Sequence, residues 1–287
     1  MRLSVITVNR NDAEGLKKTV QSVIAQDFND FEYIIVDGAS TDNSVDVIDA
    51  VNEHFKNEGR RVFRYVSESD SGIFQAMNKG IRMSCGDYLL FLNSGDFLYE
   101  SNVLSYFSEL NAEEDFVSGD IIIEQNGKLE VRRSPLQVDF LFFFKNSLPH
   151  QATFIKRDVF EIYGMYNEKN RIKSDWELSL RSLVAGDASY KHFDHVVSFF
   201  DVSGVSSQSK YCSLKRDEQR RVLVSIMPEF AVDALYHYDE KVSSFIPQSI
   251  LNNEYMSLKN GRLGWAISFL LWVKKVKRTL KMIITGC

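Results

Sequence analysis

The chain of 287 residues is 44% hydrophobic and 25% charged, which is the composition of a soluble globular protein. Its net charge of −5 argues against a general nucleic-acid binder, whose surface would be basic. Three cysteines far apart in the sequence predict neither a disulfide framework nor a zinc site, and they fit a reducing compartment.

The first apolar segment, residues 3–8, is short and rich in β-branched residues, which predicts a buried strand. Polar residues 9–12 follow at once, so the segment is too short for the hydrophobic region of a signal peptide. No apolar run reaches the roughly 18 residues of a membrane-spanning helix. We therefore expect a cytoplasmic protein.

Residues 1–96 alternate four times between predicted strands and helices, which indicates a parallel sheet with helices on its faces. The strands are expected at 3–8, 33–37, 61–66 and 88–93, and the helices within 9–26, 41–55 and 72–84. Asn11 or Asp12 is expected to cap the first helix. Apolar stripes are predicted in the second helix at Val45, Ile48, Val51 and Phe55 and in the third at Ile73, Met77 and Ile81.

Polar segments follow the four predicted strands, and ligands of such sheets bind beyond the carboxyl ends of the strands. Three of the four segments carry acid: they read Asn9-Arg10-Asn11, Asp37-Gly38, Ser67-Glu68-Ser69-Asp70 and Asn93-Ser94-Gly95-Asp96. Neither a G-x-G-x-x-G motif nor a phosphate-binding P-loop follows any strand. This weighs against a dinucleotide oxidoreductase and a P-loop enzyme.

After Asp96 the regular alternation is lost, and a mixed half is predicted. A hairpin is expected around Asn126-Gly127, and a helix at 174–184 with Trp176, Leu180, Leu183 and Val184 facing inward. Residues 140–144 form an apolar aromatic segment. We predict a domain at 1–207, divided into a parallel half (1–96) and a mixed half (97–207), and a helical extension at 208–287.

The end of the extension combines an apolar segment, residues 264–273, with the basic residues Lys274, Lys275, Lys277, Arg278 and Lys281. This segment is too short to span a bilayer and is typical of a helix that lies in the membrane interface. The alternative is a helix that packs on the catalytic domain or forms a dimer contact.

Eight segments in chain order resemble family-2 glycosyltransferases of the GT-A fold. They are "SVITVNRN", "QSVIAQDF", "FEYIIVDGASTDNS", "SESDSGIFQAMNKGI", "GDYLLFLNSGD", "LPHQATFI", "KSDWELSLR" and "SGVSS", and they lie between about residue 2 and about residue 207. Within the family, the sequence resembles enzymes of the colanic-acid type, which assemble bacterial exopolysaccharide, capsule and O-antigen. The resemblance implies an inverting enzyme that uses a nucleotide-diphosphate sugar and a divalent metal, Mn²⁺ or Mg²⁺. It also implies that 1–96 is the nucleotide-sugar-binding half and 97–207 the acceptor and catalytic half, with residues 140–144 in the core or in the wall of the acceptor site.

The resemblance gives the turn after the fourth strand a metal-binding function. The family usually shows Asp-x-Asp there, whereas this chain has Asn93-Ser94-Gly95-Asp96. Hard cations take oxygen ligands and few protein carboxylates, so Asp96 is the expected metal ligand. Asn93 is expected to bind a sugar hydroxyl or to support the metal. The alternative is that Asp96 only caps the turn.

The donor nucleotide is expected at the ends of the first three strands. Asp37 is predicted to accept a hydrogen bond from the base, and capping of the next helix is its alternative. Arg10 stands where the family often has Tyr, so it is expected to stack on the base or to pair with phosphate, or else to be a surface charge. Asp70 is expected at the base or ribose, or as a helix cap. The complete predicted donor set is Thr7, Asn9, Arg10, Asp37, Asp70, Gly72, Asn78, Asn93 and Ser94.

Asp175 is the predicted catalytic base, because an ionised carboxylate can take the proton of an attacking hydroxyl. Ser174 replaces the acid that usually precedes it in the family, and Glu177 is the second choice. The alternative for Asp175 is a first-turn acid favoured by the helix dipole. The acceptor or the diphosphate is expected at His150 and Gln151 and at a closing loop with Gly204 and Ser206.

These features predict a glycosyltransferase of cell-surface polysaccharide synthesis, with a saccharide acceptor on a lipid carrier at the inner face of the cytoplasmic membrane. A sugar-phosphate nucleotidyltransferase would need a Gly-rich, Arg-bearing loop after the first strand, which residues 7–12 lack. A degenerate nucleotide-sugar-binding or scaffold protein is the remaining alternative, because the turn at 93–96 has lost the usual acids.

Overall fold

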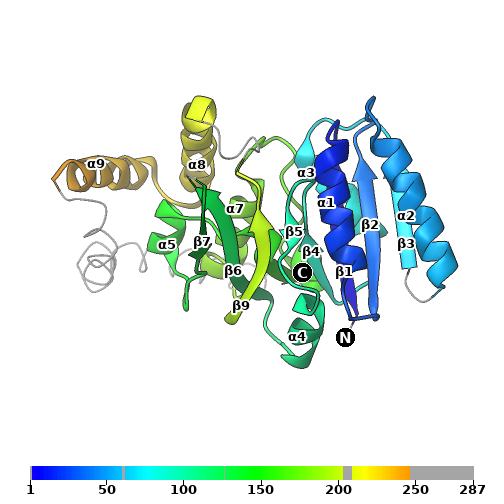
Figure 1. The fold of residues 1–287 in the computed structure, drawn as a ribbon. Helices are drawn as coiled ribbons and strands as arrows, with labels where there is room; N and C mark the ends of the chain where they lie inside the picture. The colour runs from blue at the N-terminus through cyan, green and yellow to red at the C-terminus, as the bar shows by residue number, and fades with distance from the viewer. Residues whose placement is uncertain (1, 60–61, 126, 203–208, 246–287) are drawn as a thin grey trace, which may run out of the picture.

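The computed structural model describes residues 2–59, 62–125, 127–202 and 209–245 (Figure 1). Its strands form one sheet in the order β3-β2-β1-β4-β8-β6-β9-β5, with β7 paired to β6. The strands are β1 (Leu3–Asn9), β2 (Phe31–Asp37), β3 (Val62–Ser67), β4 (Tyr88–Phe91), β5 (Phe97–Leu98), β6 (Phe116–Gln125), β7 (Lys128–Arg132), β8 (Thr153–Lys156) and β9 (Tyr190–Phe200).

The helices are α1 (Ala13–Ile24), α2 (Ser44–Glu58), α3 (Ile73–Met83), α4 (Val103–Glu109), α5 (Phe140–Lys145), α6 (Arg157–Ile162), α7 (Ser174–Ser179), α8 (Cys212–Ile226) and α9 (Glu229–Phe245). A π-helical turn, Leu180–Val184, continues α7. Asp12 caps α1, since its carboxylate accepts from the backbone N–H of Gly15 at 3.0 Å.

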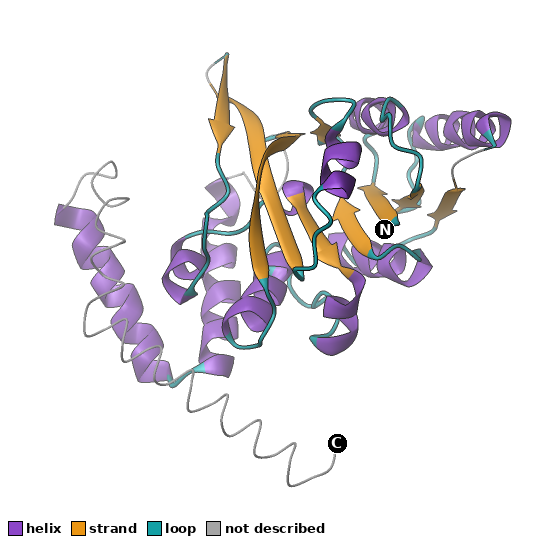
Figure 2. Ribbon diagram, turned by 90° about the horizontal axis from the view of Figure 1, so that it is seen from below, coloured by secondary structure: helices purple, strands orange, loops and turns teal. Residues whose placement is uncertain are grey.

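The parallel half that the sequence predicts is confirmed. β1 pairs in parallel with β2 and with β4, and β2 pairs in parallel with β3. β8 then runs antiparallel to both β4 and β6, which makes the second half mixed. Figure 2 shows the strands running through the middle of the molecule, with helices around them. Because β6 points the same way as β4, the carboxyl ends of β1, β4 and β6 meet at one edge.

Successive side chains of a strand point to opposite faces of the sheet, and apolar side chains form a hydrophobic core on each face. Leu3 and Val5 pack with α1 and α2, whereas Ile6 and Val8 pack with α3. Two predicted helix stripes were wrong at their first position. Val45 and Ile73 are each 39% exposed, whereas Val47, two residues after Val45, and Phe74, directly after Ile73, are buried. Val47 and Phe74 therefore belong to the helix faces that pack in the two cores.

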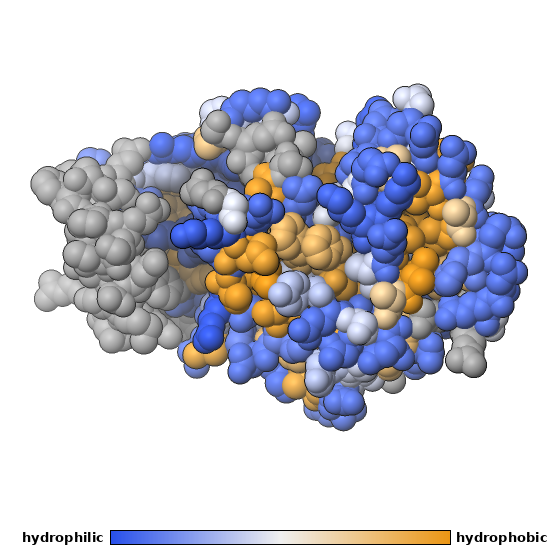
Figure 3. Space-filling view, in the orientation of Figure 1, coloured by the Kyte–Doolittle hydropathy of each residue, from blue (hydrophilic) through white to orange (hydrophobic). Residues whose placement is uncertain are grey.

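A third core joins the aromatic segment 140–144 to the C-terminal helices. Phe143 and Trp176 are buried there with Leu223 of α8 and Val232 of α9. This supports the predicted core position of the segment, although Phe142 also lines the main cleft. Figure 1 shows α9 extending away from the sheet beside α8. In Figure 3 polar residues cover the outer helices and apolar residues gather over the middle of the same face.

The hairpin expected at Asn126-Gly127 is present, since β6 and β7 pair antiparallel up to Gln125 and Lys128. The basic segment at 274–281 and the apolar segment before it lie outside the described residues. Within the described part of the chain, no helix has the length and apolarity needed to cross a membrane.

Candidate active site

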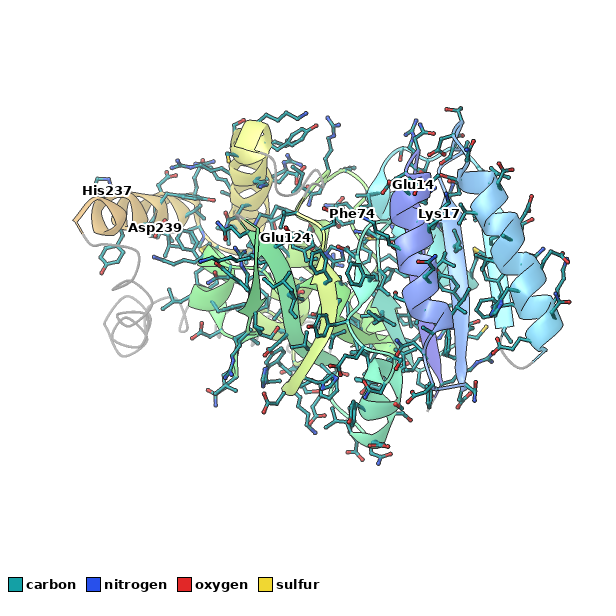
Figure 4. The ribbon with its side chains drawn as sticks, viewed as in Figure 1. Glu14, Lys17, Phe74, Glu124, His237 and Asp239 are labelled. Atoms are coloured by element: carbon teal, nitrogen blue, oxygen red, sulfur yellow. The ribbon has the colours of Figure 1, made fainter. Side chains whose placement is uncertain are left out.

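A cleft of about 980 Å³ opens at the sheet edge where β1 and β4 end, and Ile121 of β6 also lines it. Phe74 of α3 lines it and is labelled in Figure 4 between the two halves of the molecule, whereas Glu14 and Lys17 lie on the outer face of α1. The structure brings ten of the predicted site residues into its wall: Asn9, Arg10, Asp70, Gly72, Asn93, Ser94, Asp96, His150, Gln151 and Asp175.

Three predicted donor residues are buried behind this wall. Thr7 shares a hydrogen bond with the Tyr33 hydroxyl at 3.0 Å. Asn78 donates its amide to the carbonyl of Tyr166 and to Glu168, both at 2.9 Å, and so joins α3 to the loop before α7. Neither residue lines the cleft in the described structure. Their observed contacts stabilise the fold beneath the predicted donor site.

Asp37 is the third buried residue, and its carboxylate is held by its own neighbours. It accepts from the hydroxyls of Ser40 and Ser67 at 2.5 and 2.7 Å and from the Asn9 amide at 2.8 Å. Burial acts to raise the pKa of Asp37, but these hydrogen bonds outweigh it and lower that pKa below its usual value. Asp70 lies close by, because a Cβ added to Gly38 would come within 2.5 Å of its carboxylate.

The turn at residues 93–96 is fixed from below by Thr19, which sequence reasoning missed. The Thr19 hydroxyl donates to the carbonyl of Asp96 at 2.7 Å and accepts from the N–H of Gly95 at 3.1 Å. Ser94 is held from the other side, since its hydroxyl donates to Asn9 at 2.7 Å. A buried threonine inside an amphipathic helix gives no sequence signal of such a contact. α1 therefore positions the turn as well as covering the sheet.

Asp96 points into the cleft from this turn and is only 3% exposed. Its Oδ1 accepts the backbone N–H of Asp201 at 3.0 Å. Burial raises the pKa of Asp96 to about 8, and the negative charge of Asp201 acts in the same direction. Asp201 itself lines the cleft and was also missed, since one Asp after a strand is a weak signal.

His150 lies between Asp96, the predicted metal ligand, and Asp175, the predicted base. Its Nε2 is 3.9 Å from Asp96 Oδ2, and its Nδ1 is 3.7 Å from Asp175 Oδ2. Burial lowers the pKa of His150, although Asp175 acts to raise it, so the imidazole is neutral at physiological pH. The Asn93 amide lies 2.9 Å from Nε2. If Nε2 accepts from that amide, then the proton is on Nδ1, the nitrogen that faces Asp175.

Asp175 begins α7 with its side chain 22% exposed, and its Oδ1 accepts the N–H of Trp176 at 2.8 Å. The buried Trp176 ring anchors this turn, because its Nε1 donates to the carbonyl of Phe143 at 2.7 Å. Glu177, the second choice for the base, accepts from the amides of Asn167 and Asn170 and does not line the cleft. Gly204 and Ser206 lie outside the described residues.

The donor set around Asp96 fits a hard divalent cation. Asp96 and Asp201 supply carboxylate oxygens, and the buried Oδ1 of Asn93 has no hydrogen-bond partner among the described residues. A second group of ligand type lies elsewhere in the described structure. Single ligand atoms of Asp120, His192 and Asp194 are within 4.8 Å of one another, but these residues do not line the cleft.

Curated relatives of this chain are glycosyltransferases. A PGL/p-HBAD biosynthesis glycosyltransferase of Mycobacterium bovis is 31% identical over 214 residues, which cover 71% of this chain and 78% of the relative. An uncharacterized glycosyltransferase of Mycobacterium tuberculosis is 31% identical over 224 residues, covering 76% and 82%.

Solved structures with the same fold include S. aureus TarS 1-349 in complex with UDP-GlcNAc. It has a TM-score of 0.59 at 18% identity, with 81% of this chain and 70% of that chain covered. The mannosyltransferase PcManGT from Pyrobaculum calidifontis, in complex with GDP-Man and Mn²⁺, has a TM-score of 0.60 at 14% identity, covering 97% and 87%. At such identities the likeness shows a GT-A fold alone.

The family assignment rests on the sequence comparison. The model of glycosyl transferase family 2 matches residues 4–170, more than half of the chain, and this range includes the turn with Asp96 and the histidine beside it. Together with the glycosyltransferase relatives and the GT-A fold, this match means that the chain belongs to glycosyl transferase family 2 and is a glycosyltransferase.

Proposed function

We propose that the enzyme transfers a sugar from a nucleotide-diphosphate donor to a saccharide hydroxyl with inversion at the anomeric carbon. The arrangement of Asp96 and Asp175 on either side of His150 supports this proposal most directly. Inversion by a single displacement needs a base on one face of the anomeric carbon and leaving-group stabilisation on the other. Asp96 and Asp175 both line the cleft, and the His150 ring lies 3.9 Å from the first and 3.7 Å from the second.

In the proposed step the acceptor oxygen attacks the anomeric carbon while the bond to the donor diphosphate breaks. The acceptor proton goes to Asp175, whose Oδ2 is the oxygen nearest His150. An N–H on Nδ1 of His150 would face this carboxylate from 3.7 Å. The leaving nucleoside diphosphate takes the electron pair of the broken bond.

A divalent cation is proposed as the cofactor. When bound, it would neutralise the charge that develops on the diphosphate. Asp96 would hold it, and Asn93 would support it through the Oδ1 atom that has no partner among the described residues. Arg10, Asp70 and Gly72 line the donor side of the cleft and are proposed to contact the nucleotide.

The acceptor is proposed to be a saccharide on a lipid carrier in bacterial cell-surface polysaccharide synthesis. The subgroup resemblance of the sequence supports this, as does the basic segment at 274–281. The enzyme would then work at the inner face of the cytoplasmic membrane. His150 and Gln151 line the cleft beside Asp175 and are the proposed acceptor or diphosphate contacts.

The test is a panel of nucleotide sugars with Mn²⁺ and a set of saccharide acceptors, in which release of nucleoside diphosphate is measured. We expect one donor to give acceptor-dependent release that chelation abolishes. Product NMR should show the anomeric configuration opposite to that of the donor. Retention would refute inversion. Donor binding without any release, across acceptors and metals, would favour a binding protein and count against transfer.

A further inference from the structure

We propose that Asp201, at the end of β9, supplies the second metal-binding carboxylate that the turn at residues 93–96 lacks. The inference rests on the proposed metal-dependent transfer and extends it to a residue far away in the sequence. This chain has glycine at position 95, and the carboxylate of Asp201, from the end of a different strand, would take the place of an acidic side chain there. The cation it would bind is a hard divalent ion such as Mn²⁺ or Mg²⁺.

The pairing of β5 with β9 brings the two segments together. Phe97 pairs with Phe199 and Leu98 with Ser198 in an antiparallel register. The Phe97 and Phe199 rings stack with centroids 4.7 Å apart and planes 7° apart, which holds this register. Continued two residues past Phe97 and Phe199, the register sets Gly95 opposite Asp201.

Contacts at the turn agree with this placement. The backbone N–H of Asp201 donates to Asp96 Oδ1 at 3.0 Å, so the two aspartates are joined directly. A Cβ added to Gly95 would lie 2.8 Å from Asp201 Oδ2. A side chain at position 95 and the Asp201 carboxylate therefore compete for one space. Gly95 is also at a φ of +97°, a conformation that suits glycine.

The charges at this point favour a bound cation. Asp96 and Asp201 both line the cleft, and their carboxylates approach the same turn. Among the described residues, the ion pair found for Asp96 is with His150, a buried imidazole. The negative charge of Asp201 acts against ionisation of Asp96, and a divalent ion bound between two adjacent carboxylates turns such repulsion into attraction.

The test measures Mn²⁺ binding directly, by electron paramagnetic resonance of free Mn²⁺ with UDP or GDP present. Asp201→Asn keeps the size of the side chain and the backbone N–H to Asp96, and we expect it to weaken Mn²⁺ binding by at least about tenfold. The swap variant Gly95→Asp/Asp201→Ala places the carboxylate on the turn itself. It should bind Mn²⁺ more tightly than Asp201→Ala alone, because the space at position 95 is then free and Asp tolerates positive φ better than most residues.

Two variants serve as controls. Glu124→Gln removes another acid from the shallow depression that Asp201 also lines, so it tests for a general loss of negative charge. His192→Ala disrupts the separate Asp120–His192–Asp194 group, so that Mn²⁺ bound there no longer contributes to the measured binding. Both should bind Mn²⁺ at the cleft as the wild type does, and thermal melting confirms that each variant is folded.

The outcomes separate the two proposals. If Asp96→Ala loses Mn²⁺ binding while folded Asp201→Asn keeps it, Asp201 is not a ligand and the inference is wrong, although metal-dependent transfer stands. If the wild type and Asp96→Ala bind Mn²⁺ equally weakly, both proposals fail together. Loss in Asp201→Asn with recovery in the swap variant supports the inference.

Discussion

The Nδ1 atom of His150 lies 3.7 Å from Oδ2 of Asp175, and the two residues belong to different helical segments. His150 follows the aromatic segment, and Asp175 begins α7. Since burial lowers the pKa of His150, the contact joins a neutral imidazole to a carboxylate and leaves that carboxylate available as a base. The first prediction follows from this geometry.

Asp175→Asn is expected to bind donor nucleotide as the wild type does and to lose transfer by about 10²–10⁴-fold, because an amide cannot take the acceptor proton. Single-turnover transfer and nucleotide titration measure the two properties. Glu177→Gln, two residues further along, is the matched control and should retain most of the transfer rate. A retained rate above about a tenth in Asp175→Asn would exclude this residue as the base.

Asp96 gives the metal-free enzyme a distinctive pH dependence. Its pKa is about 8 in the folded protein and about 3.9 in the unfolded chain, so folding takes up a proton between these values. The contribution of Asp96 to the free energy of unfolding is therefore complete below pH about 4 and is lost as pH rises through about 8. The slope is at most about 1.4 kcal/mol per pH unit.

Urea unfolding between pH 5 and 9 with chelator measures this slope, and Asp96→Asn should flatten it. Added Mn²⁺ should restore stability at the high end of the range, since it binds the deprotonated carboxylate. Equal slopes for the wild type and Asp96→Asn would contradict the buried, proton-binding state of this side chain.

Thr19→Val should disturb the turn at residues 93–96 from α1, a helix whose residues do not line the cleft. The change removes the hydroxyl that bonds to the Asp96 carbonyl and the Gly95 N–H, and it leaves buried polar groups without partners. We expect a loss of about 1–3 kcal/mol in the free energy of unfolding, with weaker Mn²⁺ binding. Thr19→Ser keeps the hydroxyl and should restore Mn²⁺ binding. Unchanged Mn²⁺ affinity in a folded Thr19→Val would show that the turn holds its shape unaided.

Deleting residues 262–287 tests the predicted membrane contact, which rests on sequence alone. Each basic residue near anionic lipid contributes about 1 kcal/mol, and the apolar segment adds to this. The full chain should float with anionic vesicles, less so at high salt, and the truncated chain should not. Equal flotation of the two proteins, or none for either, would refute membrane docking. Transfer to a soluble acceptor serves as the control for folding.

The sequence by itself determined the parallel half of the fold and the edge at which the site lies. Apolar strands and amphipathic helices alternate with clear periods up to residue 93, and parallel strands place their carboxyl ends together. Local patterns of this kind follow from side-chain periodicity alone. They predicted that Asn9, Asp70 and Asp96 lie at one edge of the sheet, and all three line the cleft.

Only the tertiary structure decided which polar side chains face the cleft and which are buried and form hydrogen bonds within the fold. Asp37 and Asn78 follow the expected pattern in sequence, yet their hydrogen bonds go to Ser40, Tyr166 and other neighbours. Asp201 reaches Asp96 over a sequence separation of 105 residues through the pairing of β5 with β9. Such contacts depend on long-range strand register, which a local pattern does not encode because each strand can pair in many registers until the whole sheet is formed.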